Sequence, residues 1–444
     1  MVQAPETLAP SAQTSVITRG RMALLFMVML VTAAGNTAMQ SVMPSIGTAL
    51  GVADEAISLA YSWSALLWVF CAPIWARRSD RRGRKAMMAL GLAGFTTSFV
   101  LSGGVLWAGL AGMMTAIPTL ILFALTRSLY GGFGSAAPPA VQAYVASRTP
   151  RSERTRALSM VASSFALGTV IGPALAPLMI TPGFGLTGPF FIFGLLATGV
   201  LVMLRMRLPN DEPQFAARGK AFAVPYSANS PSSDDDSSED SSKPERLQWS
   251  DMRLRPWLTA GLLGGHAHAM ILGTVGFMVL DRLNLRDDPT AGAGPIGLVM
   301  MSGAIATLLV QWGIIPLLKL GPRASTLWGV LLGGAGTLLV GASQDLHAIA
   351  VSFALASMGF GLFRPGFTAG SSLAVNRAEQ GQVSGIVTSA NGLAFIFGPV
   401  IGVWLYNHSD WLSFTTVALL CAAVLILGWR SLGDDAELTA SGMD

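Results

Sequence analysis

Long apolar stretches separated by short polar segments dominate the chain. Each of twelve such stretches is long enough to supply the roughly 20 apolar residues with which a helix crosses about 30 Å of hydrocarbon. They cover residues 21–44, 56–76, 86–108, 115–146, 157–180, 185–206, 256–280, 295–319, 324–343, 347–372, 382–406 and 411–430. The pattern predicts an all-α polytopic membrane protein with twelve transmembrane helices.

Composition supports this fold class. Of the 444 residues, 52% are hydrophobic and only 12% are charged, whereas soluble globular proteins carry about 25% charged residues. A water-soluble fold of this size could not bury so much apolar surface in a single core. A soluble protein is therefore excluded.

The basic residues predict the orientation. They crowd the segments after the second and fourth stretches, as Arg77, Arg78, Arg81, Arg82, Arg84 and Lys85, and as Arg148, Arg151, Arg154 and Arg156. The loops after stretches one, three, five, nine and eleven contain no Lys or Arg, and Arg282 and Arg286 are the exceptions to the pattern. By the positive-inside bias, both termini are cytoplasmic in a plasma membrane, which for a bacterium is the inner membrane.

The polar segments divide the chain into two bundles. We expect a cytoplasmic tail, a six-helix bundle, a partly disordered cytoplasmic linker, a second six-helix bundle and a second cytoplasmic tail, at residues 1–20, 21–206, 207–255, 256–430 and 431–444. The first tail lacks the apolar core and cleavage site of a signal peptide. Residues 227–245 contain eight serines and six acids, too little apolar surface to fold, and a regulatory or metal-binding role is the alternative to a plain linker. The two cysteines, Cys71 and Cys421, lie in apolar stretches and indicate neither a disulfide framework nor a zinc site.

The two halves resemble each other. "GFGSAAPPA" (132–140) matches "GFGLFRPGF" (359–367), and "GTVIGPALA" (168–176) matches "AFIFGPVIG" (394–402). Parallel repeats of this kind place a substrate site near the membrane midplane, between halves that can rock. Five residues at matched places are expected to bend helices or allow their close approach, namely Gly168, Gly172, Pro173, Gly398 and Pro399. Simple packing glycines are the alternative.

The segment after the second stretch, "WARRSDRRGRK" (75–85), resembles the signature loop of the major facilitator superfamily. The matching residues are Asp80, Arg81, Gly83, Arg84 and Lys85, and Ala76 replaces the leading glycine. The resemblance implies that the acid latches the two halves on the cytoplasmic side and releases them during transport. The residues themselves allow Asp80 to pair with a neighbouring arginine or with a helix N-terminus, and a cluster that only sets topology is the alternative.

Two further motifs point to one group within that family. "RSLYGGFGSAA" from Arg127 resembles the family's Arg-x-x-x-Gly element, with Tyr130 where glutamine is common. "GTVIGPALAP" (168–177) resembles the Gly-x-x-x-Gly-Pro element of drug/proton antiporters, with Ala176 and Pro177 replacing the usual final glycines. The resemblance implies two pseudo-symmetric six-helix bundles and efflux by the twelve-helix drug/proton antiporter group.

Ionisable residues inside the stretches are candidates for the transport site, because each costs roughly 2.5–3.5 kcal/mol or more at a helix centre. They are Arg127, Arg364, His266 and His268, and Asp281 closes the seventh stretch at its outer side. Arg127 could hold an anionic substrate group or tune a nearby proton site. Asp and Glu are missing from the middle of every stretch, and Gly35 stands where many relatives carry an acid. We therefore expect a histidine, His266 or His268, to carry any coupled proton.

Neutral polar and aromatic residues could complete a mostly apolar pocket. The candidates are Asn36, Gln40, Asn391 and Tyr130, with Gln142 and Trp68. For each of them, packing or hydrogen bonding between helices is the alternative role.

The sequence thus predicts a secondary transporter that exports small amphipathic molecules by proton antiport with alternating access. The alternative is a major facilitator importer, a symporter or uniporter, of a siderophore, peptide or other small solute. An enzyme is not expected, and an ATP-driven pump is disfavoured because no Gly-x-x-x-x-Gly-Lys-Ser/Thr loop occurs. The expected partners are a small-molecule substrate, protons and lipid, with no nucleic acid and no cofactor, and the protein is expected to be a monomer.

Overall fold

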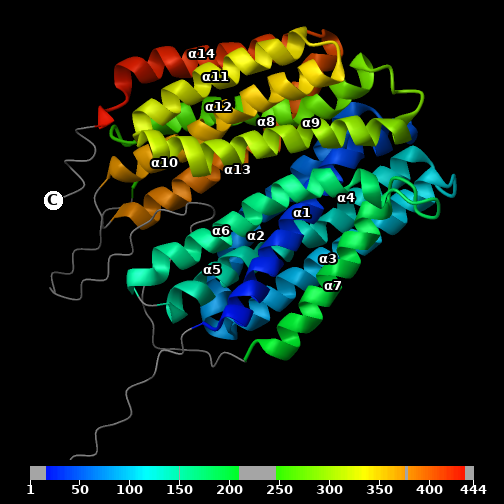
Figure 1. Cartoon of the computed structure of the whole chain (residues 1–444), viewed down its shortest axis with the longest axis horizontal. Coiled ribbons are helices and arrows are strands. Elements are labelled where there is room, and N and C mark those ends of the chain that lie inside the picture. The colour runs from blue at the N-terminus through cyan, green and yellow to red at the C-terminus, as the bar shows by residue number, and fades with distance from the viewer. Residues whose placement is uncertain (1–16, 150, 210–246, 376–378, 436–444) are drawn as a thin grey trace, which may run out of the picture.

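Helices account for nearly all of the computed structural model, which describes residues 17–149, 151–209, 247–375 and 379–435 (Figure 1). The first six spans are α1 (Arg19–Ala49), α2 (Asp54–Arg82), α3 (Arg84–Leu110), α4 (Ala116–Gly132) continued by η1 (Gly134–Ala136) and α5 (Ala137–Arg148), α6 (Arg151–Leu175), and α7 (Gly188–Arg207), with η2 (Pro177–Met179) before α7. The last six are α8 (Arg255–Arg282), α9 (Pro289–Leu309) continued by η3 (Val310–Ile314) and α10 (Ile315–Leu318), α11 (Pro322–Ala342), α12 (Leu346–Leu373), α13 (Gln380–His408), and α14 (Leu412–Ser431).

Twelve of these segments are long and apolar enough to cross a membrane, and the described residues contain no strand. Large apolar side chains on their outer surfaces, such as Leu195, Leu317 and Val351, are more than two-thirds exposed. Such surfaces suit lipid rather than water. The predicted all-α polytopic fold with twelve transmembrane helices is confirmed, and the protein is an integral membrane protein.

The helices form two bundles side by side, α1–α7 coloured blue to green and α8–α14 coloured green to red in Figure 1. Each bundle has its own apolar core. Phe95, Phe99 and Phe190 are buried in the first core, and Phe360 and Phe367 are buried in the second. The two pseudo-symmetric six-helix bundles that the repeat predicted are present.

The repeated glycines lie at equivalent helix contacts in the two bundles. Gly172 of α6 faces α1 so closely that a Cβ atom there would overlap the Ala34 carbonyl oxygen. In the second bundle, a Cβ on Gly398 of α13 would lie 2.6 Å from the Cβ of Ala269 in α8. Pro173 and Pro399 lie inside α6 and α13, each directly after the repeated glycine. Close approach of backbones at small residues is the main packing device between helices in lipid.

The ends of the bundles differ in charge. The basic end carries Arg84, Arg148, Arg205 and Arg255 at helix termini, and the opposite end carries the turn 50–53 and the segment 283–288.

The serine- and acid-rich segment 227–245 and the outer parts of both tails lie outside the described residues. The predicted division at residues 1–20, 21–206, 207–255, 256–430 and 431–444 stays a prediction.

Candidate functional site

Arg127 is the centre of a buried polar site in the first bundle. It lies on α4 with only 3% of its surface exposed. Its Nη2 donates a hydrogen bond to Oδ1 of Asn36 on α1, at 3.0 Å. Its guanidinium carbon lies 4.5 Å from the ring centre of Tyr130 and 5.7 Å from that of Phe99. Among the described residues, Nε and Nη1 of Arg127 have no hydrogen-bond partner.

Aromatic side chains surround this guanidinium. The Tyr130 ring lies 5.2 Å from Trp68 of α2 and 5.5 Å from Phe95 of α3, between ring centres. The hydroxyl of Tyr61, also on α2, is buried without a hydrogen-bond partner in the described structure. The unused donors of Arg127 therefore lie inside a cluster of aromatic side chains.

The aromatic cluster around Arg127 lies beside the boundary between the two bundles. Its helix α2 packs against α13 of the second bundle, where Gly392 accommodates the side chain of Val69. Helix α1 packs against both α8 and α9. Asn36 and Gln40 are one helical turn apart on α1, and both are half-buried. The structure thus brings together Asn36, Arg127 and Tyr130, which the sequence analysis named separately, with Gln40 on the adjoining turn of α1.

The candidates of the second bundle lie on three helices, His266 and His268 on α8, Arg364 on α12 and Asn391 on α13. His266 Nδ1 is 2.7 Å from the Leu262 carbonyl oxygen. The His268 ring stacks on Phe360 at 4.8 Å between ring centres, and it lies within electrostatic reach of Arg364. Asn391 uses its amide nitrogen on its own helix, donating to the Val387 carbonyl oxygen at 3.1 Å. Gln142, the remaining polar candidate, is half-buried on α5.

The signature loop at the basic end is only partly described, because the side chains of Asp80 and Arg81 lie outside the described structure. Gly83 joins α2 to α3 with φ 88°, a value that favours glycine over residues with a Cβ. Arg84 hydrogen-bonds Ser147 of α5, and Lys85 Nζ donates to the Arg205 carbonyl oxygen of α7 at 2.9 Å. These contacts hold the loop within the first bundle, and the latch role of Asp80 stays a prediction.

An ionic cluster that the sequence did not predict joins the two bundles at the opposite end. Arg286 donates to both carboxylate oxygens of Asp54, at 2.9 and 2.8 Å, and to both of Asp281, at 2.7 and 3.1 Å. Tyr406 donates to Asp281 at 3.0 Å, and the Asp54 side chain is only 8% exposed. Burial alone would lower the pKa of Arg286, but the hydrogen bonds from its guanidinium to Asp54 and Asp281 outweigh burial and raise it. Arg286 therefore stays charged.

The sequence did contain a signal for this cluster, because Arg286 lies outside the segments where most basic residues gather.

Helices of the two bundles also approach one another closely at glycines. A Cβ on Gly276 of α8 would lie 2.6 Å from Pro44 of α1, and a Cβ on Gly297 of α9 would lie 2.7 Å from the Pro173 carbonyl oxygen of α6. We call Arg286, Asp54, Asp281 and Tyr406 the inter-bundle lock.

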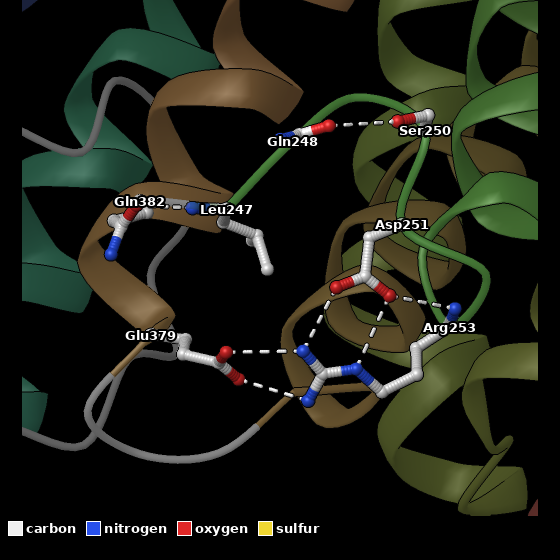
Figure 2. Close-up of polar contacts among 7 residues, drawn as sticks. All are labelled: Leu247, Gln248, Ser250, Asp251, Arg253, Glu379 and Gln382. Carbon is white, nitrogen blue, oxygen red and sulfur yellow. Dashed lines mark hydrogen bonds and ion pairs between the residues drawn. The ribbon is translucent and has the colours of Figure 1, made fainter. Parts of the chain in front are cut away.

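A second ionic cluster ties the segment before α8 to the start of α13, at the basic end (Figure 2). Arg253 donates to Asp251 and, through Nη1 and Nη2, to both carboxylate oxygens of Glu379 at 3.0 Å. The Leu247 backbone nitrogen donates to Oε1 of Gln382 at 2.8 Å. The hydrogen bonds from Arg253 lower the pKa of Asp251. This cluster lies within the second bundle and fixes how the chain enters α8.

Comparison with known proteins agrees with this architecture. A sequence model of the family described as "Major Facilitator Superfamily" matches residues 25–318 and 312–441. The chain belongs to the major facilitator superfamily. Members of this family are transporters and, in general, not enzymes, and the resemblance noted from the signature loop is confirmed.

Relatives of this major facilitator protein carry the names of efflux systems. "Multidrug resistance protein 2" of Bacillus subtilis is 25% identical over 413 residues, 89% of this chain and 91% of that protein. "Tetracycline resistance protein, class C" of Escherichia coli is 25% identical over 379 residues, covering 82% and 85%. The resemblance to the drug/proton antiporter group is thereby confirmed.

A solved structure shares the fold. The inward-open xylose transporter XylE from E. coli superposes with a TM-score of 0.68 at 13% identity, covering 95% of this chain and 99% of that one. At this identity the likeness shows the fold alone.

Proposed function

We propose that the protein exports small amphipathic molecules by proton antiport, with alternating access to a site between its bundles. The observation that carries this proposal is the combination of a polar site beside the bundle boundary with a lock that closes one end of that boundary. A transporter of two rocking halves needs both features. The names of the multidrug and tetracycline resistance relatives favour export over import.

In this proposal the basic end faces the cytoplasm and the inter-bundle lock faces outward. The distribution of basic residues supports this orientation, together with cytoplasmic termini and a bacterial inner-membrane location. A monomer suffices, because both bundles of the transport unit belong to one chain.

In this proposal, different residues bind the substrate, carry the proton and control closure. Arg127, Asn36, Gln40 and Tyr130 form the substrate side of the first bundle. A histidine of α8, His266 or His268, carries or gates the proton, while Arg364 and Asn391 line the second bundle. The signature loop, including Asp80, controls closure at the cytoplasmic end.

The test is transport by purified protein in vesicles with an imposed pH difference and a fluorescent amphipathic drug as the probe. Export coupled to protons predicts drug movement opposite to proton flow, which stops when an uncoupler removes the pH difference. Drug movement together with protons would instead establish symport. Cells that overproduce the protein should also tolerate more of the drug than cells that lack it.

Import of a siderophore, peptide or other small solute is the second candidate, and Gly35 is the observation that keeps it. Drug/proton antiporters often carry an acid at this place, but here a Cβ would lie 2.6 Å from the Phe95 ring. The packing of the first bundle therefore leaves no room for an acidic side chain at position 35. Proton-driven accumulation of a solute inside cells would favour this candidate over export.

A further inference from the structure

Arg127 carries positive charge inside the first bundle, and no carboxylate of the described residues pairs with it. Arg127 and Arg364 lie within spans, whereas the acids of the helices lie close to span ends, as Asp54, Asp281 and Glu153 do. A cationic substrate would approach Arg127 against its charge, and none of the described acids lies beside Arg127 to offset that repulsion. Electrostatic complementarity at the site therefore favours a substrate of negative charge.

Arg127 has hydrogen-bond donors available for a negatively charged group. A guanidinium has five N–H donors, and Asn36 accepts one hydrogen bond from Nη2. Nε and Nη1 are buried and unpartnered among the described residues, as is the hydroxyl of Tyr61. Buried donors without partners destabilise the empty site, and an ionised acceptor offsets this cost better than a neutral one.

The aromatic residues next to Arg127 bear on the rest of the ligand. Trp68 and Tyr130 contact each other with ring centres 5.2 Å apart, and Phe95 packs edge-on to Tyr130, so that the half-buried Trp68 supplies the accessible ring face. Aromatic walls of this kind bind flat apolar bodies, while a few polar groups fix their orientation. The arrangement matches an acid attached to an aromatic ring.

We infer that the exported molecules are aromatic organic anions, whose carboxylate accepts hydrogen bonds from Nε or Nη1 of Arg127. This inference rests on the proposed export function for the direction of movement, and on Arg127 and its aromatic neighbours for the chemistry of the ligand. Asn36 is then a positioning residue, because its Oδ1 holds one side of the guanidinium.

The test uses three probes that share one ring system and differ only in a carboxylate, a primary amide or a primary amine. Equilibrium binding to the purified full-length protein is measured for each probe. The carboxylate should bind about tenfold to a hundredfold more tightly than the amide, as expected for hydrogen bonds to a charged group. The amine should bind most weakly. Equal binding of all three probes by the unaltered protein would overturn the inference without recourse to any variant.

Variants of Arg127 test whether this residue binds the carboxylate of the probe. Arg127→Gln should reduce carboxylate binding to the level of the amide and leave amide binding unchanged. Arg127→Lys should restore part of the difference, because a lysine keeps the charge but not the planar fork. Arg282→Gln is the matched control, since Arg282 contacts Gln344, Gly341 and Asp410 within the second bundle. Unchanged carboxylate preference in Arg127→Gln would contradict the assignment.

Transport of the same probes separates this inference from the proposed function. If the carboxylate binds through Arg127 but moves only inward, the ligand assignment stands and the export proposal fails. If the amine is exported and the carboxylate is neither bound nor exported, export stands and the anion inference fails.

Discussion

His266 and His268 are two residues apart on α8 and lie in different surroundings. The Nδ1 atom of His266 is engaged by the Leu262 carbonyl oxygen, and the ring of His268 lies against Phe360 and Phe395. Each ring is half-buried. Because the two rings have different surroundings, substituting them one at a time can show which of them carries the proton.

Proton-driven transport should depend on these histidines. We expect the double variant His266→Gln, His268→Gln to bind substrate but lose its accumulation against a gradient, because glutamine keeps polarity and cannot take up a proton. The two single variants show which ring is responsible. The measurement is uptake into vesicles with an imposed pH difference. A double variant that still concentrates substrate would exclude both histidines as the carrier.

Asp80 should affect the conformational cycle rather than affinity. Asp80→Asn removes the lone acid of the signature loop, and we expect transport to fall severalfold while ligand binding at equilibrium stays within about twofold, a change of roughly 0.4 kcal/mol. Glu153→Gln is the control, since Glu153 is an exposed acid at the same end. Equal transport by Asp80→Asn and the unaltered protein would remove the latch role.

The polar site could be predicted from sequence only one residue at a time. Arg127, Asn36 and Tyr130 stood out because polar groups are costly in apolar spans. Their mutual contacts depend on how α1 and α4 pack. Asp54 and Arg286 were missed as partners because both lie in loops or helix ends, where a charge costs little. The unusual position of Arg286 in the distribution of basic residues did not show which acids it contacts.

At the scale of helices, the periodic apolar pattern located all twelve spans, since each span must satisfy its own backbone hydrogen bonds in lipid. The pattern did not locate the breaks within two of them. The fourth span changes to a 3₁₀ turn over Gly134–Ala136, and the eighth widens to a π-helix over Val310–Ile314, shortly before Pro316. Pro316 indicates a disturbed helix there, because proline lacks the N–H that a regular turn needs. Tertiary packing, which the apolar pattern does not describe, decides which form the preceding turn takes.

The repeated glycines allow a matched test of packing. A Cβ on Gly172 of α6 would overlap the Ala34 carbonyl oxygen and the Thr37 hydroxyl of α1, whereas a Cβ on Gly199 of α7 would meet no atom of the other described elements within 4 Å. We expect Gly172→Val to destabilise the protein by about 1–3 kcal/mol through overpacking and Gly199→Val to be nearly neutral. Thermal unfolding in detergent is the measurement. Equal unfolding temperatures for the two variants would show that α6 can move away from α1.

At the scale of the whole molecule, the inter-bundle lock should set the balance between states closed and open at the outward-facing end. Removing one charged partner of a hydrogen-bonded pair costs roughly 1.5–3 kcal/mol. Arg286→Gln should therefore shift the ratio of closed to open molecules by about tenfold or more toward open. Arg282→Gln should leave the ratio unchanged, because its contacts stay within one bundle.

A cysteine at Ser45 reports this opening. Ser45 is fully buried beside Gly292 of the other bundle, and Cys71 and Cys421 can be replaced so that the new thiol is the sole target. A membrane-impermeant maleimide should label Ser45→Cys faster in the Arg286→Gln background. A labelling rate equal to that of the Arg282→Gln background would contradict the assigned role of the lock.

The lock also bears on how the chain is assembled during synthesis. Asp54 and Arg286 are 232 residues apart, so at about 5 to 20 residues per second Asp54 leaves the ribosome roughly 10 to 50 seconds before Arg286. Throughout that interval its carboxylate lies at the end of a helix, where water can hydrate it. The bond can form only once the second bundle has been inserted and has met the first. A chain released after α7 would display an unpaired acid at its surface, which would distinguish it from a finished transporter.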